Sequence, residues 1–134
     1  MPNVTINFGL TYTPPAAAQN SGQAVIATTA AYEAQSVGTL DIPTTITPAS
    51  IIAVPFNAID NGAQVFMIQN LTANPVGVRL NGAVANNFQL ESGASWSYFG
   101  PSIPTTDPLT AVDVEIITAP VTSTHYINYW VFGD

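Results

Sequence analysis

Short runs in which apolar and polar residues alternate make up most of the chain. Alternation with a period of two is typical of a β-strand that buries one face, because successive side chains of a strand point to opposite sides of the sheet. Such runs occur at residues 4–8, 65–70, 76–80, 88–91, 95–98, 112–116 and 124–132. In the run at 65–70 both alternating sets are largely apolar, which favours a central strand.

Turn-forming residues separate these runs. The sequence has 11 prolines and 9 glycines spread along its length, and Asn61-Gly62 is a strong signal for a tight turn. Further turn sequences lie at residues 72–75, 80–82, 91–93 and 99–101. Strands at a spacing of roughly 8–12 residues predict an all-β sandwich or barrel. With about eight to ten strands, we expect a jelly-roll-like antiparallel β-sandwich with an extended N-terminal arm.

The first 48 residues differ in composition from the rest. After the expected first strand, the segment from Thr13 to Gly22 has two prolines directly after Thr13 and continues with small and polar residues, which is typical of a loop or an extended arm. The other expected segments are a strand at 23–28, a helical turn at 30–35, a strand at 37–42 and a connector at 44–48. We therefore divide the chain into residues 1–48, an N-terminal strand with arm and connector, and 49–134, the β-sandwich core, within one structural domain.

Charge is scarce in this chain and almost entirely negative. There are eight acidic residues, one arginine (Arg79) and no lysine, which gives a net charge of −7. Nucleic-acid binding requires cationic side chains that neutralise phosphates, and one arginine does not supply them. Binding to anionic membrane surfaces is disfavoured for the same reason. The absence of cysteine excludes a disulfide scaffold, a zinc finger and a cysteine enzyme.

No membrane-spanning segment and no secretory signal are evident in the sequence. No apolar run approaches the length of about 18 residues that a membrane-spanning helix requires. The first residues form neither a positively charged region nor an apolar leader. We therefore expect the protein to act where it is made or to leave the cell by lysis.

Few residues indicate a specific chemistry. Asp113 and Glu115 are two residues apart and therefore lie on the same face of the expected strand. They could bind calcium, act as an acid–base pair or form part of a solvated strand surface. His125, the only histidine, has neither a second histidine nor a Gly-x-Ser-x-Gly turn to work with, and we interpret it as a packed or interface residue. Arg79 is expected to bind a carboxylate, within the chain or across a subunit boundary. We assign no catalytic residue, metal ligand or cofactor.

Aromatic residues gather in the second half of the chain. They are Trp96, Tyr98, Phe99, Tyr126, Tyr129, Trp130 and Phe132. Such rings either stack on sugars, as in a carbohydrate-binding module, or fill the sandwich core or a subunit interface. The sequons at Asn3 and Asn70 are interpreted as chance matches, because no secretory signal accompanies them.

The low charge favours association of the chain with other proteins. Only 7% of the residues are charged, so the surface must consist largely of Thr, Ser, Asn, Gln and Ala. Interface cores are depleted in charge, and lysine is depleted in particular. Such a surface suits close packing against copies of the same chain or against another protein shell.

Three short motifs resemble a known family. A strand ends in Asn70-Leu71-Thr72-Ala73, a valine-rich strand follows at 76–80, and Phe88-Gln89-Leu90-Glu91-Ser92-Gly93 leads into an aromatic strand. Together with the closing hydrophobic strand, this order resembles small structural proteins of tailed bacteriophages over residues 60–134. The resemblance implies a β-sandwich virion component, either a capsid decoration (cement) protein or a head, neck or tail accessory, in a family whose members are often trimeric.

These observations lead to one main hypothesis for function. We expect a non-enzymatic virion protein, made in the host bacterial cytoplasm, that binds and stabilises the assembled phage head as a homotrimer. Its partners would be copies of itself and the major capsid protein or another virion protein, with residues 1–48 making the attachment. The candidate partner or interface residues are Arg79, Trp96, Tyr98, His125, Tyr129 and Trp130.

Two alternatives remain open. The first is a glycan-binding module or a tail- or fibre-associated receptor-binding component, which would use the aromatic residues. The second is a hydrolase that uses Asp113 and Glu115.

Overall fold

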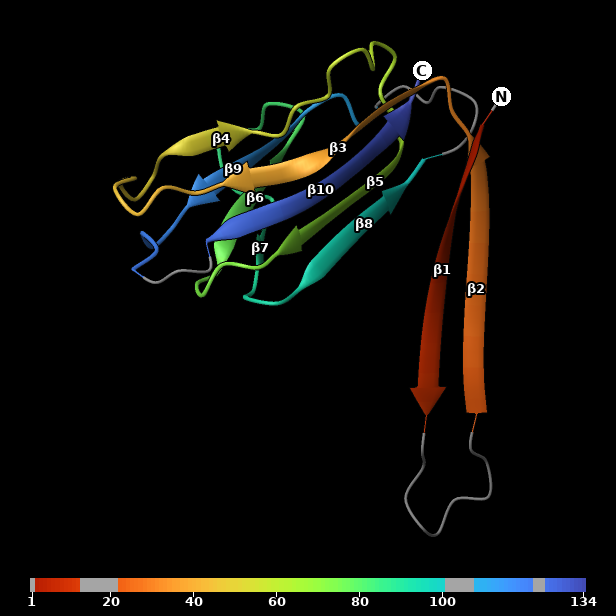
Figure 1. Cartoon of the computed structure of the whole chain (residues 1–134), viewed down its shortest axis with the longest axis horizontal. Coiled ribbons are helices and arrows are strands. Elements are labelled where there is room, and N and C mark those ends of the chain that lie inside the picture. Colours follow the sequence, from red (N-terminus) through yellow and green to blue (C-terminus); the bar gives the residue numbers. More distant parts are fainter. Residues whose placement is uncertain (1, 13–21, 101–107, 122–124) are drawn as a thin grey trace, which may run out of the picture.

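The computed structural model describes residues 2–12, 22–100, 108–121 and 125–134 (Figure 1). These residues form ten β-strands and no helix. The strands are β1 (Asn3–Tyr12), β2 (Gly22–Ala31), β3 (Ala34–Asp41), β4 (Ile51–Ala53), β5 (Ala63–Asn70), β6 (Val76–Leu80), β7 (Phe88–Leu90), β8 (Ser95–Phe99), β9 (Val112–Ile116) and β10 (Tyr126–Gly133).

Eight of these strands form two antiparallel sheets that pack face to face. One four-stranded sheet has the order β3-β10-β5-β8, and the other has the order β4-β9-β6-β7 (Figure 1). We call them the first and the second sheet. Strands β1 and β2 pair only with each other, as a separate two-stranded sheet. The prediction of an all-β sandwich is confirmed, and β5 lies between two neighbours, as its two apolar sets of residues predicted.

The eight sandwich strands pair from the outside inward. The chain pairs β3 with β10, β4 with β9, β5 with β8 and β6 with β7, all antiparallel. The pairs β10–β5 and β6–β9 then join these ribbons into sheets. Every connection except β6–β7 passes from one sheet to the other. The sheets therefore depend on pairings between residues far apart in the sequence.

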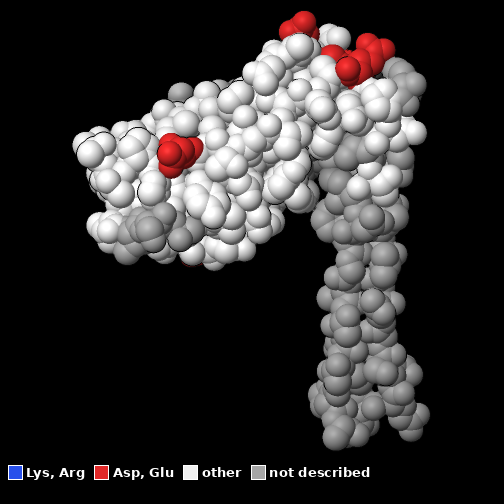
Figure 2. Space-filling view, in the orientation of Figure 1, with Lys and Arg blue, Asp and Glu red and all other residues white. Residues whose placement is uncertain are grey.

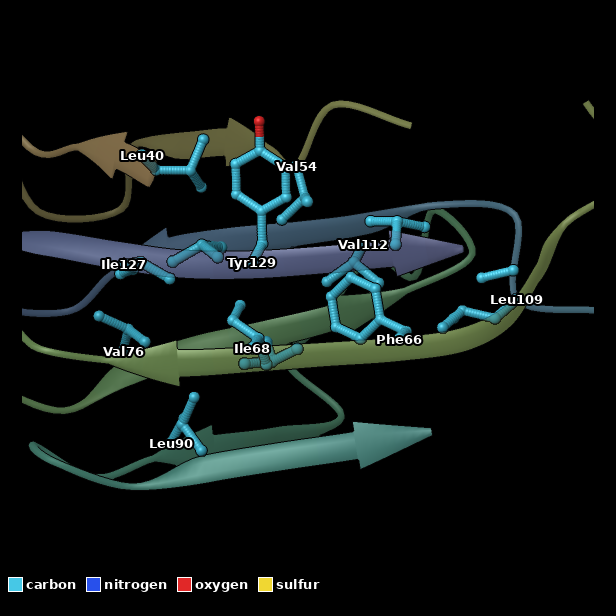
Figure 3. Close-up of a cluster of buried hydrophobic side chains, with 14 of the residues drawn as sticks. Leu40, Val54, Phe66, Ile68, Val76, Leu90, Leu109, Val112, Ile127 and Tyr129 are labelled. Atoms are coloured by element: carbon cyan, nitrogen blue, oxygen red, sulfur yellow. The ribbon is translucent and has the colours of Figure 1, made fainter. Parts of the chain in front are cut away.

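The core lies between the two sheets and comes from the inward-facing half of each alternating strand. In β9, Val112, Val114 and Ile116 are buried while the residues between them are half-buried. Strands β5 and β10 supply Phe66, Ile68, Ile127, Tyr129 and Val131 to the same cluster (Figure 3). Each such aliphatic or aromatic side chain contributes about 1.5–3 kcal/mol by leaving water. The alternation predicted for residues 112–116 is confirmed.

The first part of the chain departs from expectation at one point. The helical turn predicted for residues 30–35 is wrong, because Ala31 ends β2 and Ala34 and Gln35 begin β3. Ala34 pairs with Gly133, and Gln35 pairs with Phe132. Alanine and glutamine are good helix formers, but helix propensity is a weak determinant, and pairing with a strand from the far end of the chain overrides it.

The segment expected to be an arm is only partly described. Residues 13–21 lie outside the described residues, while β1 and β2 on either side of them form a hairpin of ten residues per strand. Figure 1 shows this hairpin, in red and orange, extending away from the sandwich. Strand β3 also lies within residues 1–48, but it is an edge strand of the first sheet.

Candidate functional surfaces

Trp96 and Tyr98 face the sandwich core. They lie on edge strand β8, and both pack half-buried against the core cluster. The Trp96 ring is 5.0 Å from the ring of Phe88 and 5.9 Å from that of Phe66, measured between centroids. Indole and phenyl rings at these separations gain contact energy in addition to burial. These two residues therefore close one side of the core.

Arg79 is held within its own chain. Its guanidinium forms an ion pair with Glu115 on the neighbouring strand β9, and Nε donates a hydrogen bond to Asn86 Oδ1 at 3.2 Å. The side chains of Arg79 and Glu115 are only 17% and 18% exposed. Gly77 lies under Asn86, whose amide occupies the space that a β-carbon would take. The carboxylate partner expected for Arg79 is thus present in the same subunit.

The paired carboxylates of β9 lie on the outer face of the second sheet. Asp113 is opposite Arg79 in the strand register, and Glu115 is opposite Gly77. Because Glu115 is already neutralised by the guanidinium, the pair is a mixed-charge cluster rather than two free acids. Among the described residues, no group of three or more His, Cys, Asp and Glu side chains is placed to hold a metal ion.

His125 lies just before β10, at the end of the sandwich opposite the C-terminus. Its Nε2 is 3.3 Å from Asp41 Oδ1, and its carbonyl oxygen accepts a hydrogen bond from the Ile42 backbone at 2.8 Å. The side chain of His125 is 25% exposed and that of Asp41 is 84% exposed. These contacts connect the end of β3 to the start of β10.

Tyr129 and Trp130 are neighbours in the sequence but lie on opposite faces of the first sheet. Tyr129 points into the core between Leu40 and Val54 (Figure 3), and its ring lies against Gly38, where a larger residue would not fit. Trp130 is half-buried and faces outward, opposite Val37 on one side and Met67 on the other. Trp96, Tyr98 and Tyr129 face the core, whereas Trp130 lies on an outer face.

Trp130 belongs to an apolar band across the outer face of the first sheet. The register places two rows side by side, Val37–Trp130–Met67 and Phe132–Val65–Phe99. Val37 is 51% exposed, whereas Val65 is 1% exposed and lies outside the core cluster. The apolar band is defined as the residues of these two rows other than Val65, which lies beneath them. It consists of Val37, Met67, Phe99, Trp130 and Phe132.

The apolar band carries no charged residue. The neighbouring row of the same face has the neutral side chains of Thr39, Asn128 and Gln69, and Asp41 stands at the far end. Figure 2, which views this sheet from outside, shows a broad surface without charged atoms between one isolated red patch and the red groups at the end where the termini lie. Sequence reasoning found Trp130 but not the band, because the other members lie on different strands and only the register brings them together.

The hairpin is the second surface without charge. Residues 1–32 contain no Asp, Glu, Lys, Arg or His. The hairpin pairs with no other strand, while the backbone NH of Glu33 donates to Gly133 O at 3.0 Å and joins its base to β10. Next to it, the ring of Tyr32 meets the ring of Phe132 edge-on, with centroids 4.9 Å apart. The base of the hairpin therefore adjoins one end of the apolar band.

The Asn70-Leu71-Thr72 sequence has a structural explanation. Asn70 is fully buried, and its Nδ2 donates hydrogen bonds to the carbonyl oxygens of Leu90 and Asn74, both at 2.9 Å. Its Oδ1 accepts from the Thr72 backbone NH at 2.9 Å and from the Thr72 hydroxyl at 2.7 Å. This side chain joins the β5–β6 turn to β7. The sequon at this position is therefore part of the interior of the fold.

The comparisons with known proteins add no relative. No family model, no curated protein and no solved structure matches the chain. The described part of the chain also contains no helix that is long and apolar enough to cross a membrane.

Proposed function

We propose that this chain is a non-enzymatic virion structural protein, most specifically a capsid decoration (cement) protein that binds the assembled phage head as a homo-oligomer. The observation that carries this proposal is the pair of uncharged surfaces, the hairpin and the apolar band, on a molecule with a net charge of −7. Such surfaces bury against other proteins without desolvating charge. The resemblance to phage structural proteins suggests that the protein is part of a virion and that it assembles as a trimer.

A finer assignment of the fold belongs to the same proposal. The first of the eight sandwich strands pairs with the last, the second with the second-last, and so on, and these pairs are divided between two sheets. This pattern is expected when a long antiparallel ribbon is wound into a jelly roll. Jelly rolls occur in viral capsid proteins and in lectins. The assignment therefore supports a virion component and is equally compatible with the glycan-binding alternative.

The mechanism is stabilisation by mass action. A protein that binds the assembled head, but not its separated subunits, lowers the free energy of the assembled state and so resists its disassembly. In this proposal the hairpin reaches from each sandwich to a neighbouring protein on the particle surface. Strand edges and uncharged side chains make such contacts without requiring complementary charge.

The glycan-binding alternative has weaker support. Trp96 and Tyr98, which suggested it, pack against the core. Trp130 does lie on an outer face, in the row next to Asn128 and Gln69. One half-buried indole beside two amides is a smaller platform than the sequence had indicated.

The test of the proposal is whether the protein is part of a particle. Lysate of the cells that carry the gene is sedimented through a sucrose gradient, and the fractions are probed with an antibody against the purified chain. We expect the protein to sediment with particles in a fixed ratio to the major shell protein. Recovery of all the protein in the slow, soluble fractions, while intact particles sediment without it, would overturn the virion assignment.

A further inference from the structure

The hairpin lacks the support that two-stranded sheets normally require. A single two-stranded hairpin is marginally stable at best in water, and three strands or a packed face are needed for independent stability. Strands β1 and β2 have ten residues each and pair only with each other. Figure 1 shows them extending away from the sandwich. A hairpin of this length therefore requires a surface outside its own sandwich.

The sequence of the hairpin indicates which of its faces needs covering. The backbone register pairs Phe8 with Ile26 and Leu10 with Ala24. The alternation of the sequence groups these positions with Val4 and Ile6 on one face, and it groups Asn3, Thr5, Asn7 and Thr11 on the other. The sequence therefore predicts an apolar strip along β1 on one face of the hairpin.

The apolar band is the matching surface on the sandwich. It is uncharged, it lies on the outer face of a sheet, and its most exposed member, Val37, lies on edge strand β3. Two sheets pack with their faces about 10 Å apart when both present apolar side chains. We propose that the hairpin of one copy of this chain packs against the apolar band of a second copy.

Charge restricts where a second copy can bind. Each molecule carries a net charge of −7, and its single arginine is paired with Glu115, so copies repel each other through most of their surfaces. Neither the hairpin nor the band contributes a charged side chain to the contact, so a second copy can bind there without direct repulsion between charged groups. A basic partner would find no acidic residue within the band to bind.

The hairpin is longer than the band. A ten-residue strand is about 33 Å long and a two-stranded ribbon is about 10 Å wide, whereas the band covers two rows across four strands, roughly 14 Å by 7 Å between backbones. About half of the hairpin therefore lies on the band, and the accessible surface removed there is on the order of 500 Å² for one contact, so two contacts per copy are needed to approach the lower limit for specific interfaces. A copy that gives its hairpin to one neighbour and receives another takes part in two such contacts.

The contact joins two different surfaces, and this determines the symmetry of the assembly. Such head-to-tail contacts close into rings or continue as filaments, whereas a contact between identical surfaces stops at a dimer. This inference deepens the homo-oligomer part of the proposed function and rests on it. It can be tested without any particle, so its failure would leave the virion assignment standing.

Four full-length variants, in two matched pairs, test the inference. Phe8→Glu places a charge on the apolar strip of the hairpin, and Asn7→Glu places the same charge on its other face. Val37→Glu places a charge on the band, and Val84→Glu makes the same change at a loop valine that is 93% exposed. Circular dichroism and thermal unfolding confirm that each variant folds, and light scattering after size exclusion gives its mass over a range of concentrations.

We expect the wild type and the two control variants, Asn7→Glu and Val84→Glu, to associate alike. Phe8→Glu and Val37→Glu should each weaken association at least about tenfold in Kd. A mixture of these two defective proteins should form a one-to-one complex, because one retains an intact band and the other an intact hairpin.

Three results would overturn the inference. The first is a wild-type protein that remains monomeric at all concentrations, whether or not it binds glycans on an array. The second is association by Phe8→Glu or Val37→Glu that is as tight as that of the wild type. The third is two defective proteins that do not combine when mixed, which would indicate a contact between identical surfaces.

Discussion

At the scale of the residue, buried polar side chains define the turns of this sandwich. Asn70 satisfies two carbonyl oxygens and receives two hydrogen bonds from Thr72, all within a site that water does not reach. Arg79, Glu115 and Asn86 form a second network on the outer face of the second sheet. Each of these polar groups is costly to bury alone and inexpensive when all its partners are present.

Replacement of Asn70 tests the first network. Asn70→Ala removes the side-chain donor to the Leu90 carbonyl oxygen and the acceptor of the Thr72 backbone NH, while the Asn74 carbonyl oxygen keeps the Thr72 hydroxyl, so we expect it to lower the free energy of unfolding by about 2–4 kcal/mol. Asn70→Asp keeps the shape but faces the carbonyl oxygens of Leu90 and Asn74 with a negative charge, and it should be at least as damaging. Urea denaturation measures both variants.

The matched control for this experiment is Asn87→Ala. Asn87 is exposed, and its Oδ1 accepts one hydrogen bond, from the Leu80 backbone at 2.8 Å. Its loss should cost less than about 1 kcal/mol. Equal stabilities for the Asn70 and Asn87 variants would contradict the structural role assigned to Asn70.

At the scale of the element, the ten strands differ sharply in how they are supported. Strand β10 pairs on both sides, with β3 and β5, and contributes Ile127, Tyr129 and Val131 to the core. Strands β1 and β2 have one partner each, and both lie outside the sandwich. Local stability follows buried apolar contacts and shielded hydrogen bonds, so these elements should open with very different free energies.

Hydrogen exchange measures this difference directly. In dilute, monomeric protein we expect the amides of β1 and β2 to exchange at least about a hundredfold faster than those of β10, because a lone hairpin opens easily. At concentrations where copies associate, the hairpin amides should become protected while those of β10 change little. Hairpin amides as protected as those of β10 in a monomer would show that the hairpin is stable by itself.

At the scale of the whole molecule, the charge distribution determines how copies meet. Eight acidic residues and one arginine leave a net negative charge on every copy, and the apolar band is free of it. Association through uncharged surfaces therefore works against a general repulsion. Salt screens that repulsion over about 10 Å at 0.1 M and leaves apolar contacts intact.

The dependence of association on salt follows from this distribution. Raising NaCl from about 20 mM to about 200 mM shortens the Debye length from roughly 20 Å to roughly 7 Å, so we expect self-association to become a few-fold tighter. Light scattering at the two salt concentrations measures it. Weaker association at high salt would instead indicate a contact held by ion pairs, contrary to the contact proposed here.

The sequence by itself determined the fold class and most of the inward-facing residues. The period-two alternation at 112–116 gave the buried and half-buried faces of β9, and the two apolar sets at 65–70 indicated a central strand. That Arg79 would bind a carboxylate followed from the scarcity of cations, although neither the identity of that carboxylate nor its place in the same chain did. These features are local or compositional, so they can be inferred without knowledge of the partners in space.

Tertiary structure alone decided which outward-facing residues meet. Val37, Trp130 and Met67 lie far apart in the sequence and become neighbours only through the registers of β3, β10 and β5. The same pairing turned residues 34–35 into strand, against their helical preference. Register depends on the whole set of cross-strand contacts, and a shift of one residue would move Trp130 to the core side. For this reason the apolar band, unlike the core, could not be predicted from the sequence.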